Sequence, residues 1–354
     1  MEVGLAETLQ YNVQLLASKK LDVIPSRYIR PELAADIICM DKASVIPVID
    51  FSKLCDDTFS QDELEKFHLA CQDWGFFQLV NHEVPKEVLE KVKTDLTEFF
   101  NLPIEEKMAC QQPGQEEGYG LVVMFSDEQK LDWGDMIGIV TQPETTRNVN
   151  VWPNSPLTFR ETIAQYSLEL QKIKTCILGL MAKNLGIEPE KFTNMFEGGM
   201  QSMRINYYPP CQKDDKVLGL SPHSDSNGIT FLIQVNDVQG LQIRHEGCWV
   251  PVVLSTDAIL VNIGDVLEIL TNGRYKSVEH RVVINKNKER LSVAAFHELN
   301  ENETIEPLQE LIKEGEDKCY RSLSFAEYQK LESSHYLSHY LDGKTLIEKM
   351  KLKK

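Results

Sequence analysis

The chain has 354 residues, of which 42% are hydrophobic and 26% are charged, and its formal net charge is -17. This composition indicates a globular protein with a real core and excludes a largely disordered chain. The negative surface repels phosphate backbones and anionic lipid headgroups. We therefore expect neither a nucleic-acid partner nor a membrane partner.

Targeting and cysteine patterns favour a cytoplasmic protein. Residues 1–20 lack the basic start, the apolar core and the small-residue cleavage site of a secretory signal, and no apolar run is long enough to cross a bilayer. The eight cysteines are scattered and include no CxxC pair, which argues against a zinc or dithiol motif. We therefore expect reduced cysteines and a cytoplasmic location.

In chain order, the first half is predicted to be mainly helical. A capping box at 60–63 begins one helix, and residues 76–80 follow as a short buried strand. A second helix covers 88–100. A third, longer helix begins at Ser155-Pro156, with serine as the cap and proline in the first turn, and ends near Gly186.

The second half changes to short strands separated by turn signals such as Asn-Gly and Gly-Asp. The predicted strands are 203–208, 229–235, 241–244, 249–254, 259–263, 266–270, 278–284 and 291–296. Many short strands of this kind indicate a barrel or jelly roll. We expect an α+β fold in one integrated unit: a mainly helical region at 1–200, a jelly-roll core at 201–300 and a helical tail at 301–354.

The first candidate site is a metal centre. His223 and Asp225 form a His-x-Asp pair, whose side chains point to one face if the segment is a strand. Such a pair is weak evidence alone, because a surface turn also explains it. His280, on a separate predicted strand, is the expected third ligand, since a jelly roll returns one strand beside another. Two imidazoles and one carboxylate suit non-haem iron(II) with open positions, although zinc with a water also fits.

His297 is the main competitor for a place among these ligands, since it ends the last predicted strand of the core. It lies seven residues after Arg290, so the two side chains are expected on opposite faces of one regular strand. This alternation makes His280 the better ligand.

The second candidate site binds an anion. Arg290 and Ser292 lie two residues apart in an otherwise apolar strand and are expected to face the same way. An arginine in an apolar interior needs an anionic partner, and its fork can bind a carboxylate with two hydrogen bonds. Asn206 and Tyr208 share a face and could bind the same ligand, but a tyrosine corner before a proline turn explains Tyr208 equally well.

An ordered set of motifs resembles the plant 2-oxoglutarate- and Fe(II)-dependent dioxygenases over nearly the whole chain. The motifs are IPVID at 46–50, ACQDWGFFQLVNH at 70–82, NYYPPC at 206–211, HSD at 223–225, NIGD at 262–265, NGRYKSVEHR at 272–281 and RLS at 290–292. IPSRY at 24–28 and LDW at 131–133 resemble the branch of senescence-related proteins and alkaloid O-demethylases.

The resemblance implies a double-stranded β-helix and an oxidoreductase whose catalytic group is the metal. The implied iron ligands are His223, Asp225 and His280, and the implied partners of the far 2-oxoglutarate carboxylate are Arg290, Ser292, Tyr208 and Asn206. It further implies that O2 and 2-oxoglutarate are consumed while a substrate C–H bond is oxidised, giving hydroxylation, desaturation or O- or N-demethylation. Ascorbate is expected to support activity.

The implied substrate is a small specialised plant metabolite, such as an alkaloid or a phenylpropanoid, bound by a monomer. Phe296 would line the pocket and could stack on an aromatic ring, although core packing explains it nearly as well. Met124 and Phe125 form an apolar pair between charged segments and could cover the pocket from the N-terminal side.

Two other functions stay open. A same-fold oxidase that depends on ascorbate and not on 2-oxoglutarate also keeps an Arg-x-Ser pair, but the long extension before Ile46 argues against it. A non-catalytic binding protein on a jelly-roll scaffold would have no reason to keep a complete ligand set.

Overall fold

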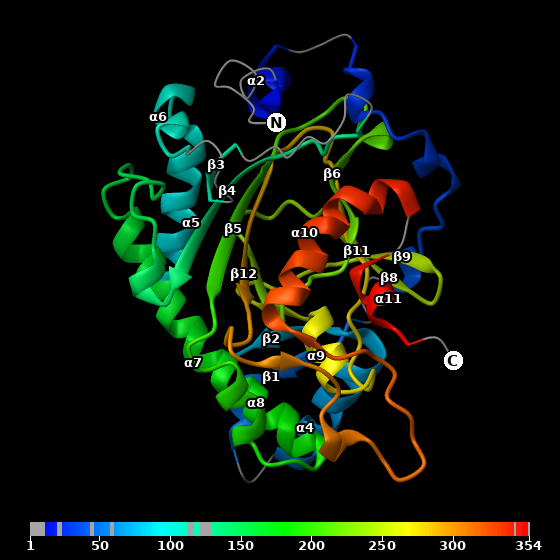
Figure 1. Ribbon diagram of the computed structural model, residues 1–354. Coiled ribbons are helices and arrows are strands. Elements are labelled where there is room, and N and C mark those ends of the chain that lie inside the picture. The colour runs from blue at the N-terminus through cyan, green and yellow to red at the C-terminus, as the bar shows by residue number, and fades with distance from the viewer. Residues whose placement is uncertain are drawn as a thin grey trace.

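The computed structural model of the chain describes residues 11–19, 23–42, 46–56, 60–111, 117–120, 129–342 and 345–352. Two β-sheets form its centre, and helices lie outside them (Figure 1). Among the described strands, every pair is antiparallel except β1 with β2, as expected for sheets joined by short connections.

The larger sheet has eight strands in the order β1-β2-β10-β7-β12-β5-β4-β3. Their bounds are β1 Val48–Asp50, β2 Phe76–Val80, β3 Gly118–Tyr119, β4 Asp135–Gln142, β5 Gln201–Tyr208, β7 Ile229–Gln234, β10 Ile259–Ile263 and β12 Arg290–His297. The smaller sheet has the order β6-β11-β8-β9. Its strands are β6 Leu218–His223, β8 Leu241–His245, β9 Cys248–Pro251 and β11 His280–Val283. A separate short pair joins β13 (Thr304–Ile305) to β14 (Leu323–Ser324).

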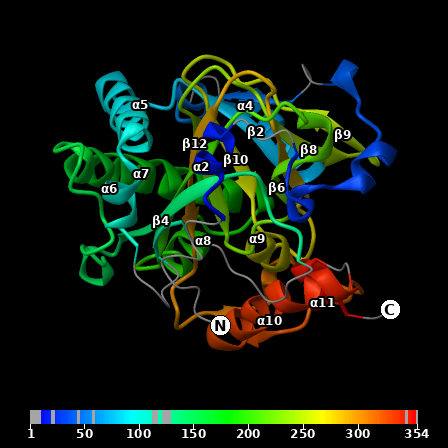
Figure 2. The same cartoon turned by 90° about the horizontal axis from the view of Figure 1, so that it is seen from above.

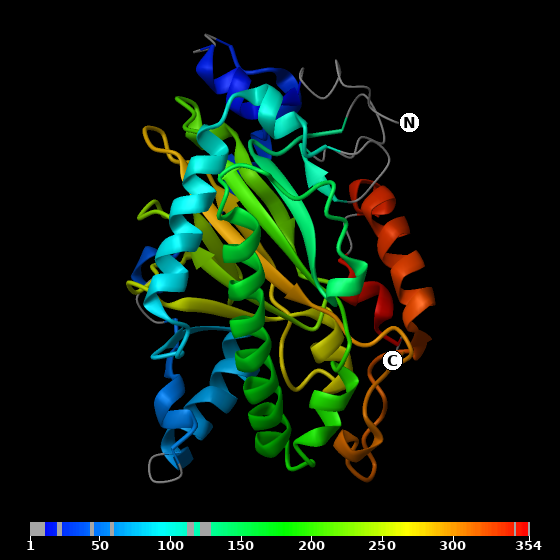
Figure 3. The same cartoon turned by 90° about the vertical axis from the view of Figure 1, so that its left-hand side faces the viewer.

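The helices are α2 Val13–Ser18, α3 Phe51–Leu54, α4 Ser60–Leu69, α5 Lys86–Asn101, α6 Ile104–Met108, α7 Phe159–Leu185, α8 Glu190–Met195, α9 Asp265–Leu270, α10 Phe325–Asp342 and α11 Leu346–Met350. The long helices α5 and α7 cross the outer face of the larger sheet (Figure 3). The C-terminal helices α10 and α11 lie together at one side of the two sheets (Figure 2). Among the described helices, none is long and apolar enough to cross a membrane.

The alternating residues of strand β12 show why the two faces of the larger sheet differ. Leu291, Val293 and Ala295 are buried in the core that the larger sheet shares with α5 and α7. Arg290 and Ser292 alternate with them and therefore point to the other face, toward the smaller sheet. A second apolar core lies there. Apolar cores on both sheets therefore pack around the segment that carries Arg290 and Ser292.

The predicted α+β fold with a jelly-roll core and helices near both ends is confirmed. Most predicted elements lie within a few residues of the observed ones. Segment 266–270 is an exception: it was expected to be a strand, but it forms the helix α9. Every residue of this helix is buried, so its hydrophobic pattern lacks the 3.6-residue period that identifies a surface helix.

One helix boundary also differs from the sequence prediction. The third long helix begins at Phe159 and not at Ser155, and its N-cap is Thr158. The strands β1 to β4 precede residue 201 yet join the same sheet as β5 and β12. Residues on both sides of position 200 therefore contribute strands to one sheet.

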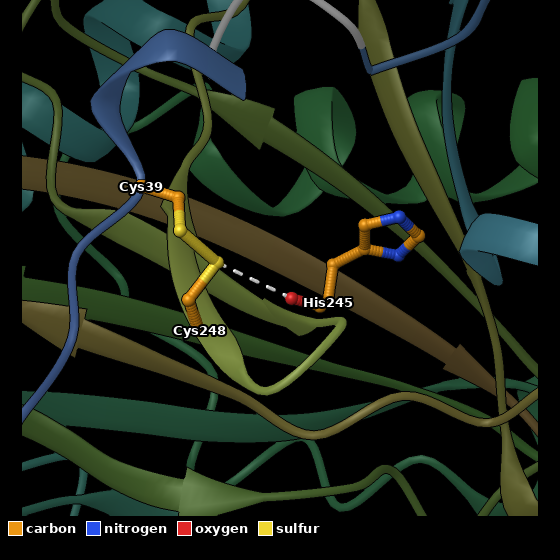
Figure 4. The surroundings of a disulfide bond; sticks show 3 residues. All are labelled: Cys39, His245 and Cys248. Atoms are coloured by element: carbon orange, nitrogen blue, oxygen red, sulfur yellow. Dashed lines mark hydrogen bonds between the residues drawn. A yellow bond between two sulfur atoms is a disulfide. The ribbon is translucent and has the colours of Figure 1, made fainter.

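The expectation that all cysteines are reduced is wrong for one pair. Cys39 and Cys248 form a disulfide, with their Cα atoms 6.0 Å apart (Figure 4). Ile38 pairs with Trp249 as a parallel bridge, and this contact brings the two sulfur atoms together. The 209-residue separation left no sequence pattern from which the pairing could be predicted. The Cys248 Sγ atom also lies 3.4 Å from the carbonyl oxygen of His245, across the tight β8–β9 turn.

Candidate metal and anion site

The structure brings the three predicted metal ligands together between the two sheets. One ligand atom from each of His223, Asp225 and His280 lies within 4.8 Å of the others. The Oδ1 atom of Asp225 is 3.5 Å from His223 Nε2 and 3.6 Å from His280 Nε2. Such a cluster of two imidazoles and one carboxylate can hold a divalent cation on one face.

Strand pairing explains how residues so far apart in the sequence meet. His223 ends β6, His280 begins β11, and the two residues are directly opposite each other in the antiparallel pair. Strand alternation, from which His223 and Asp225 were expected to share a face, does not fully explain the position of Asp225. This residue lies in the loop just after β6 and not in the strand.

Both imidazoles are oriented by backbone carbonyl groups. His223 Nδ1 donates to the carbonyl oxygen of Ser221 at 2.9 Å, and His280 Nδ1 donates to that of Val278 at 3.1 Å. A carbonyl oxygen only accepts, so each Nδ1 carries the proton. Each Nε2 therefore keeps a lone pair that faces the cluster, as a metal site requires.

The Asp225 carboxylate is fixed by two neighbours. Thr230 Oγ1 donates to Asp225 Oδ2 at 2.6 Å, and Asn262 Nδ2 donates to the same atom at 2.7 Å. This leaves Oδ1 as the atom that faces both histidines. The loop is held close to Gly264, where a Cβ atom would lie 2.0 Å from the carbonyl oxygen of Asn227.

Burial and charge set the protonation of the three groups. Burial opposes ionisation of Asp225, but the charges of His280 and His223 and the hydrogen bond from Thr230 hold its pKa well below the usual range. Burial, together with the charge of His223, lowers the pKa of His280 to about 4. Burial also lowers the pKa of His223, but the nearby Asp225 outweighs it and raises that pKa above its ordinary value. At neutral pH the cluster therefore offers an ionised carboxylate and a neutral His280.

The competing histidine lies elsewhere. His297 is buried, its Nε2 atom is 2.8 Å from Gln201 Nε2, and its ring packs edge-on against Phe231. It points to the face of β12 opposite Arg290, as the strand alternation predicted.

Arg290 is buried without a charge partner. Its Nη1 atom donates to Ser292 Oγ at 3.2 Å, while its Nε and Nη2 atoms have no hydrogen-bond partner. Within the described part of the chain, no carboxylate forms an ion pair with it. Burial lowers the pKa of Arg290. Since a buried cation with free donors is costly, this site fits an anionic ligand that supplies the missing acceptors.

Tyr208 and Asn206 lie beside this arginine. In the β5–β12 register Tyr208 is opposite Arg290 and Asn206 is opposite Ser292. The guanidinium carbon is 5.4 Å from the centre of the Tyr208 ring. Burial raises the pKa of Tyr208 to about 12, so its hydroxyl group stays protonated and can donate to an anion. The structure thus groups all four residues predicted for the anion site.

Phe296 is on the same face of β12 as Arg290 and Ser292 and is half-buried. The Cζ atom of Arg204 lies 5.9 Å from the centre of its ring. The other two expected pocket residues, Met124 and Phe125, lie outside the described residues.

Several supporting residues were missed from the sequence. Thr230, Asn262 and the carbonyl of Ser221 each orient a ligand, but only Asn262 gave a signal. It is an amide inside the apolar run 259–263, and a buried amide needs hydrogen-bond partners.

The fold and the cluster define a non-haem oxygenase, and sequence comparison gives the same class. Residues 199–299 match the 2OG-Fe(II) oxygenase superfamily, and residues 46–155 match the non-haem dioxygenase in morphine synthesis N-terminal family. The chain belongs to the 2OG-Fe(II) oxygenase superfamily and is a 2-oxoglutarate- and Fe(II)-dependent dioxygenase.

Similar proteins cover nearly the whole chain. S-norcoclaurine synthase 1 of Coptis japonica is 50% identical over 96% of both chains. Codeine O-demethylase of Papaver somniferum is 40% identical over 96% of both chains, in agreement with the predicted branch. The crystal structure of JOX2 in complex with 2OG, Fe and JA superposes with a TM-score of 0.82 at 37% identity, covering 90% of this chain and 92% of that one.

Proposed function

We propose that this dioxygenase binds Fe(II) through His223, Asp225 and His280 and oxidises a C–H bond of a small specialised plant metabolite, an alkaloid or a phenylpropanoid. The observation that carries the proposal is the combination of an open three-ligand cluster with a buried arginine that lacks an anion. When bound, the iron supplies the site at which O2 is activated.

The residues around the metal ligands keep the cluster ready for a cation. The proton on each Nδ1 is held by a backbone carbonyl, so neither imidazole has to change tautomer before it binds. Thr230 and Asn262 hold one oxygen of Asp225 and leave the other available. One carboxylate and two imidazoles, once both rings are neutral, also leave coordination positions for a co-substrate.

Arg290 and Ser292 would bind the far carboxylate of 2-oxoglutarate. Two free guanidinium donors can form charge-assisted hydrogen bonds to its oxygens, and the burial of the site strengthens them. Tyr208 can donate from its hydroxyl group and Asn206 from its amide. No catalytic side chain beyond the metal ligands is proposed.

The substrate would bind next to Phe296, whose half-buried ring shares a face with the anion site. An aromatic substrate could stack on this ring. The name of codeine O-demethylase, at 40% identity, supports demethylation among the possible outcomes. Met124 and Phe125 are proposed to cover the pocket. We further propose a monomer that binds neither nucleic acid nor membrane and whose activity ascorbate supports.

A substrate screen by mass spectrometry tests the proposal. Full-length protein is incubated with Fe(II), ascorbate and a library of alkaloids and phenylpropanoids, with and without 2-oxoglutarate. The expected result is a product whose formation requires 2-oxoglutarate and is matched by succinate. The mass change distinguishes hydroxylation, desaturation and demethylation.

The same screen separates the alternatives. Product with ascorbate but without 2-oxoglutarate would indicate an oxidase of the same fold. A product without succinate would also agree with the name synthase that the Coptis relative carries. No product from any compound, with metal bound, would favour a binding protein. The variant His223→Ala serves as the inactive control.

A further inference from the structure

Residues 24–39, here called the N-terminal strap, precede the N-terminal family match that begins at residue 46. The strap contacts the smaller sheet through Arg30, which reaches Ser221 of β6, and through Asp36, which reaches Arg281 of β11. At the start of the strap, the IPSRY motif at 24–28 contacts the LDW motif at 131–133, and neither motif has a role in the site described above. The ring of Tyr28 packs edge-on against Trp133 at 5.1 Å, and the amide of Leu131 donates to the carbonyl oxygen of Arg27 at 2.9 Å.

Arg30 connects the strap to the strand that carries His223. Its side chain is 8% exposed, and its Nη2 atom donates to Asp132 Oδ1 at 2.9 Å and to Ser221 Oγ at 2.6 Å. Asp132 in turn accepts from the backbone amide of Ser221 at 3.1 Å. The carbonyl of the same Ser221 accepts the Nδ1 proton of His223. Arg30 thus fixes the residue that orients this ligand.

Asp36 connects the strap to the strand that carries His280. Its carboxylate pairs with the guanidinium of Arg281, the residue directly after His280. The Arg281 side chain is 4% exposed, donates through Nε to Gln242 at 2.8 Å and lies over the Trp249 ring at 4.1 Å. Because a buried guanidinium needs its anion, Asp36 holds this part of β11 in place.

The end of the strap is covalently fixed. Cys39 is bonded to Cys248, and the backbone amide of Cys39 donates to the carbonyl oxygen of Trp249 at 2.9 Å (Figure 4). The disulfide limits the freedom of the strap, so the Arg30 and Asp36 contacts form at a smaller entropic cost.

Strands β6 and β11, which carry His223 and His280, need such support because their pairing is irregular. The pairing of β11 with β6 is in register at His280 and His223, but the register shifts between His280 and Val282 and again before Val283. Backbone pairing is therefore irregular directly beside the ligands. The His223 side chain is also 33% exposed, so packing alone does not fix its ring.

We propose that the N-terminal strap is a positioning element of the metal site, in which Arg30 orients His223 and Asp36 orients His280. The inference rests on the proposed function, because it assumes that these histidines hold a metal. Groups that orient metal ligands typically change metal affinity about 10- to 100-fold when they are removed.

The test measures Co(II) affinity of the full-length protein by competition with a chelator. The variants are Arg30→Ala, Arg30→Lys and Asp36→Ala. The matched control is Arg27→Ala, since Arg27 lies in the same strap and contacts Tyr11 through its side chain. Amide hydrogen exchange of β6 and β11 in the metal-free protein and the thermal midpoint are recorded for each protein.

We expect Arg30→Ala and Asp36→Ala to weaken Co(II) binding about 10- to 100-fold and to speed exchange in β6 and β11 respectively. Arg30→Lys should recover part of the affinity, and Arg27→Ala should bind as the wild type does. Equal affinity in Arg30→Ala and Arg27→Ala, with only the thermal midpoint changed, would overturn the inference. Failure of the wild type to bind Co(II) would instead overturn the proposed metal site.

Discussion

Replacement of Arg290 by methionine separates ligand binding from stability. Methionine keeps an unbranched side chain but removes the charge and the donors. In the structure two of the guanidinium nitrogens have no hydrogen-bond partner and the third donates to Ser292, with Tyr208 beside the group. If 2-oxoglutarate supplies the missing acceptors, the variant should bind it much more weakly. The same change removes an uncompensated buried charge, so the ligand-free protein should be as stable as the wild type or more stable.

The expected loss of 2-oxoglutarate affinity follows from the burial of the ion pair that Arg290 would form with the ligand carboxylate. Loss of one partner of a buried, hydrogen-bonded charge pair costs about 2–5 kcal/mol of binding free energy. This corresponds to binding of 2-oxoglutarate that is roughly 30-fold to a few thousandfold weaker. Ser292→Ala removes one neutral donor and should cost only about 0.5–1.5 kcal/mol. Arg290→Lys keeps the charge but not the fork, and should lie between the two.

The assay measures the KM for 2-oxoglutarate and, independently, the rise in thermal midpoint that 2-oxoglutarate produces in the metal-loaded protein. Urea unfolding without ligand gives the stability. The reasoning is refuted if Arg290→Met binds 2-oxoglutarate as tightly as Ser292→Ala does. It is also refuted if the ligand-free variant loses several kcal/mol, because Arg290 would then have an internal partner.

Three further predictions concern other residues of the protein. Asn262→Ala should weaken Fe(II) affinity about 10- to 100-fold, as measured by chelator competition, because Asp225 loses a hydrogen bond; unchanged affinity would contradict this role. Burial lowers the pKa of His297 to about 3. The unfolded chain therefore binds more protons between pH 3 and 6.5, and the free energy of unfolding falls as the pH falls through this range. His297→Gln should remove about 1 kcal/mol of the loss seen between pH 7.5 and 5.5 in urea unfolding, and an identical loss in both proteins would refute the assignment. Phe296→Ala should raise the KM for the organic substrate while the KM for 2-oxoglutarate stays unchanged; equal changes in both would place Phe296 in the core.

Local patterns were enough to predict much of the site. Alternation along β12 correctly placed Arg290 and Ser292 on one face and His297 on the other, because the side-chain period of a strand is two. The long separation of His223 and His280 was also interpreted correctly, since the jelly roll pairs β6 with β11.

The remaining features depend on tertiary contacts that have no local pattern. Asp225 is placed by a loop packed on Gly264, and α9 is helical although its fully buried sequence resembles a strand. The Cys39–Cys248 disulfide arises because the strap runs beside β9. The Arg30 contacts likewise join residues more than 100 positions apart.

The central claim is that His223, Asp225 and His280 hold Fe(II) and leave room for 2-oxoglutarate. An anaerobic titration of the Fe(II)-loaded protein with 2-oxoglutarate tests it directly, through the visible charge-transfer absorption of a keto acid bound to Fe(II). We predict that the wild type develops this absorption to saturation at one 2-oxoglutarate per chain, and that Asp225→Ala and His280→Ala do not. The same absorption in Asp225→Ala as in the wild type would contradict the account.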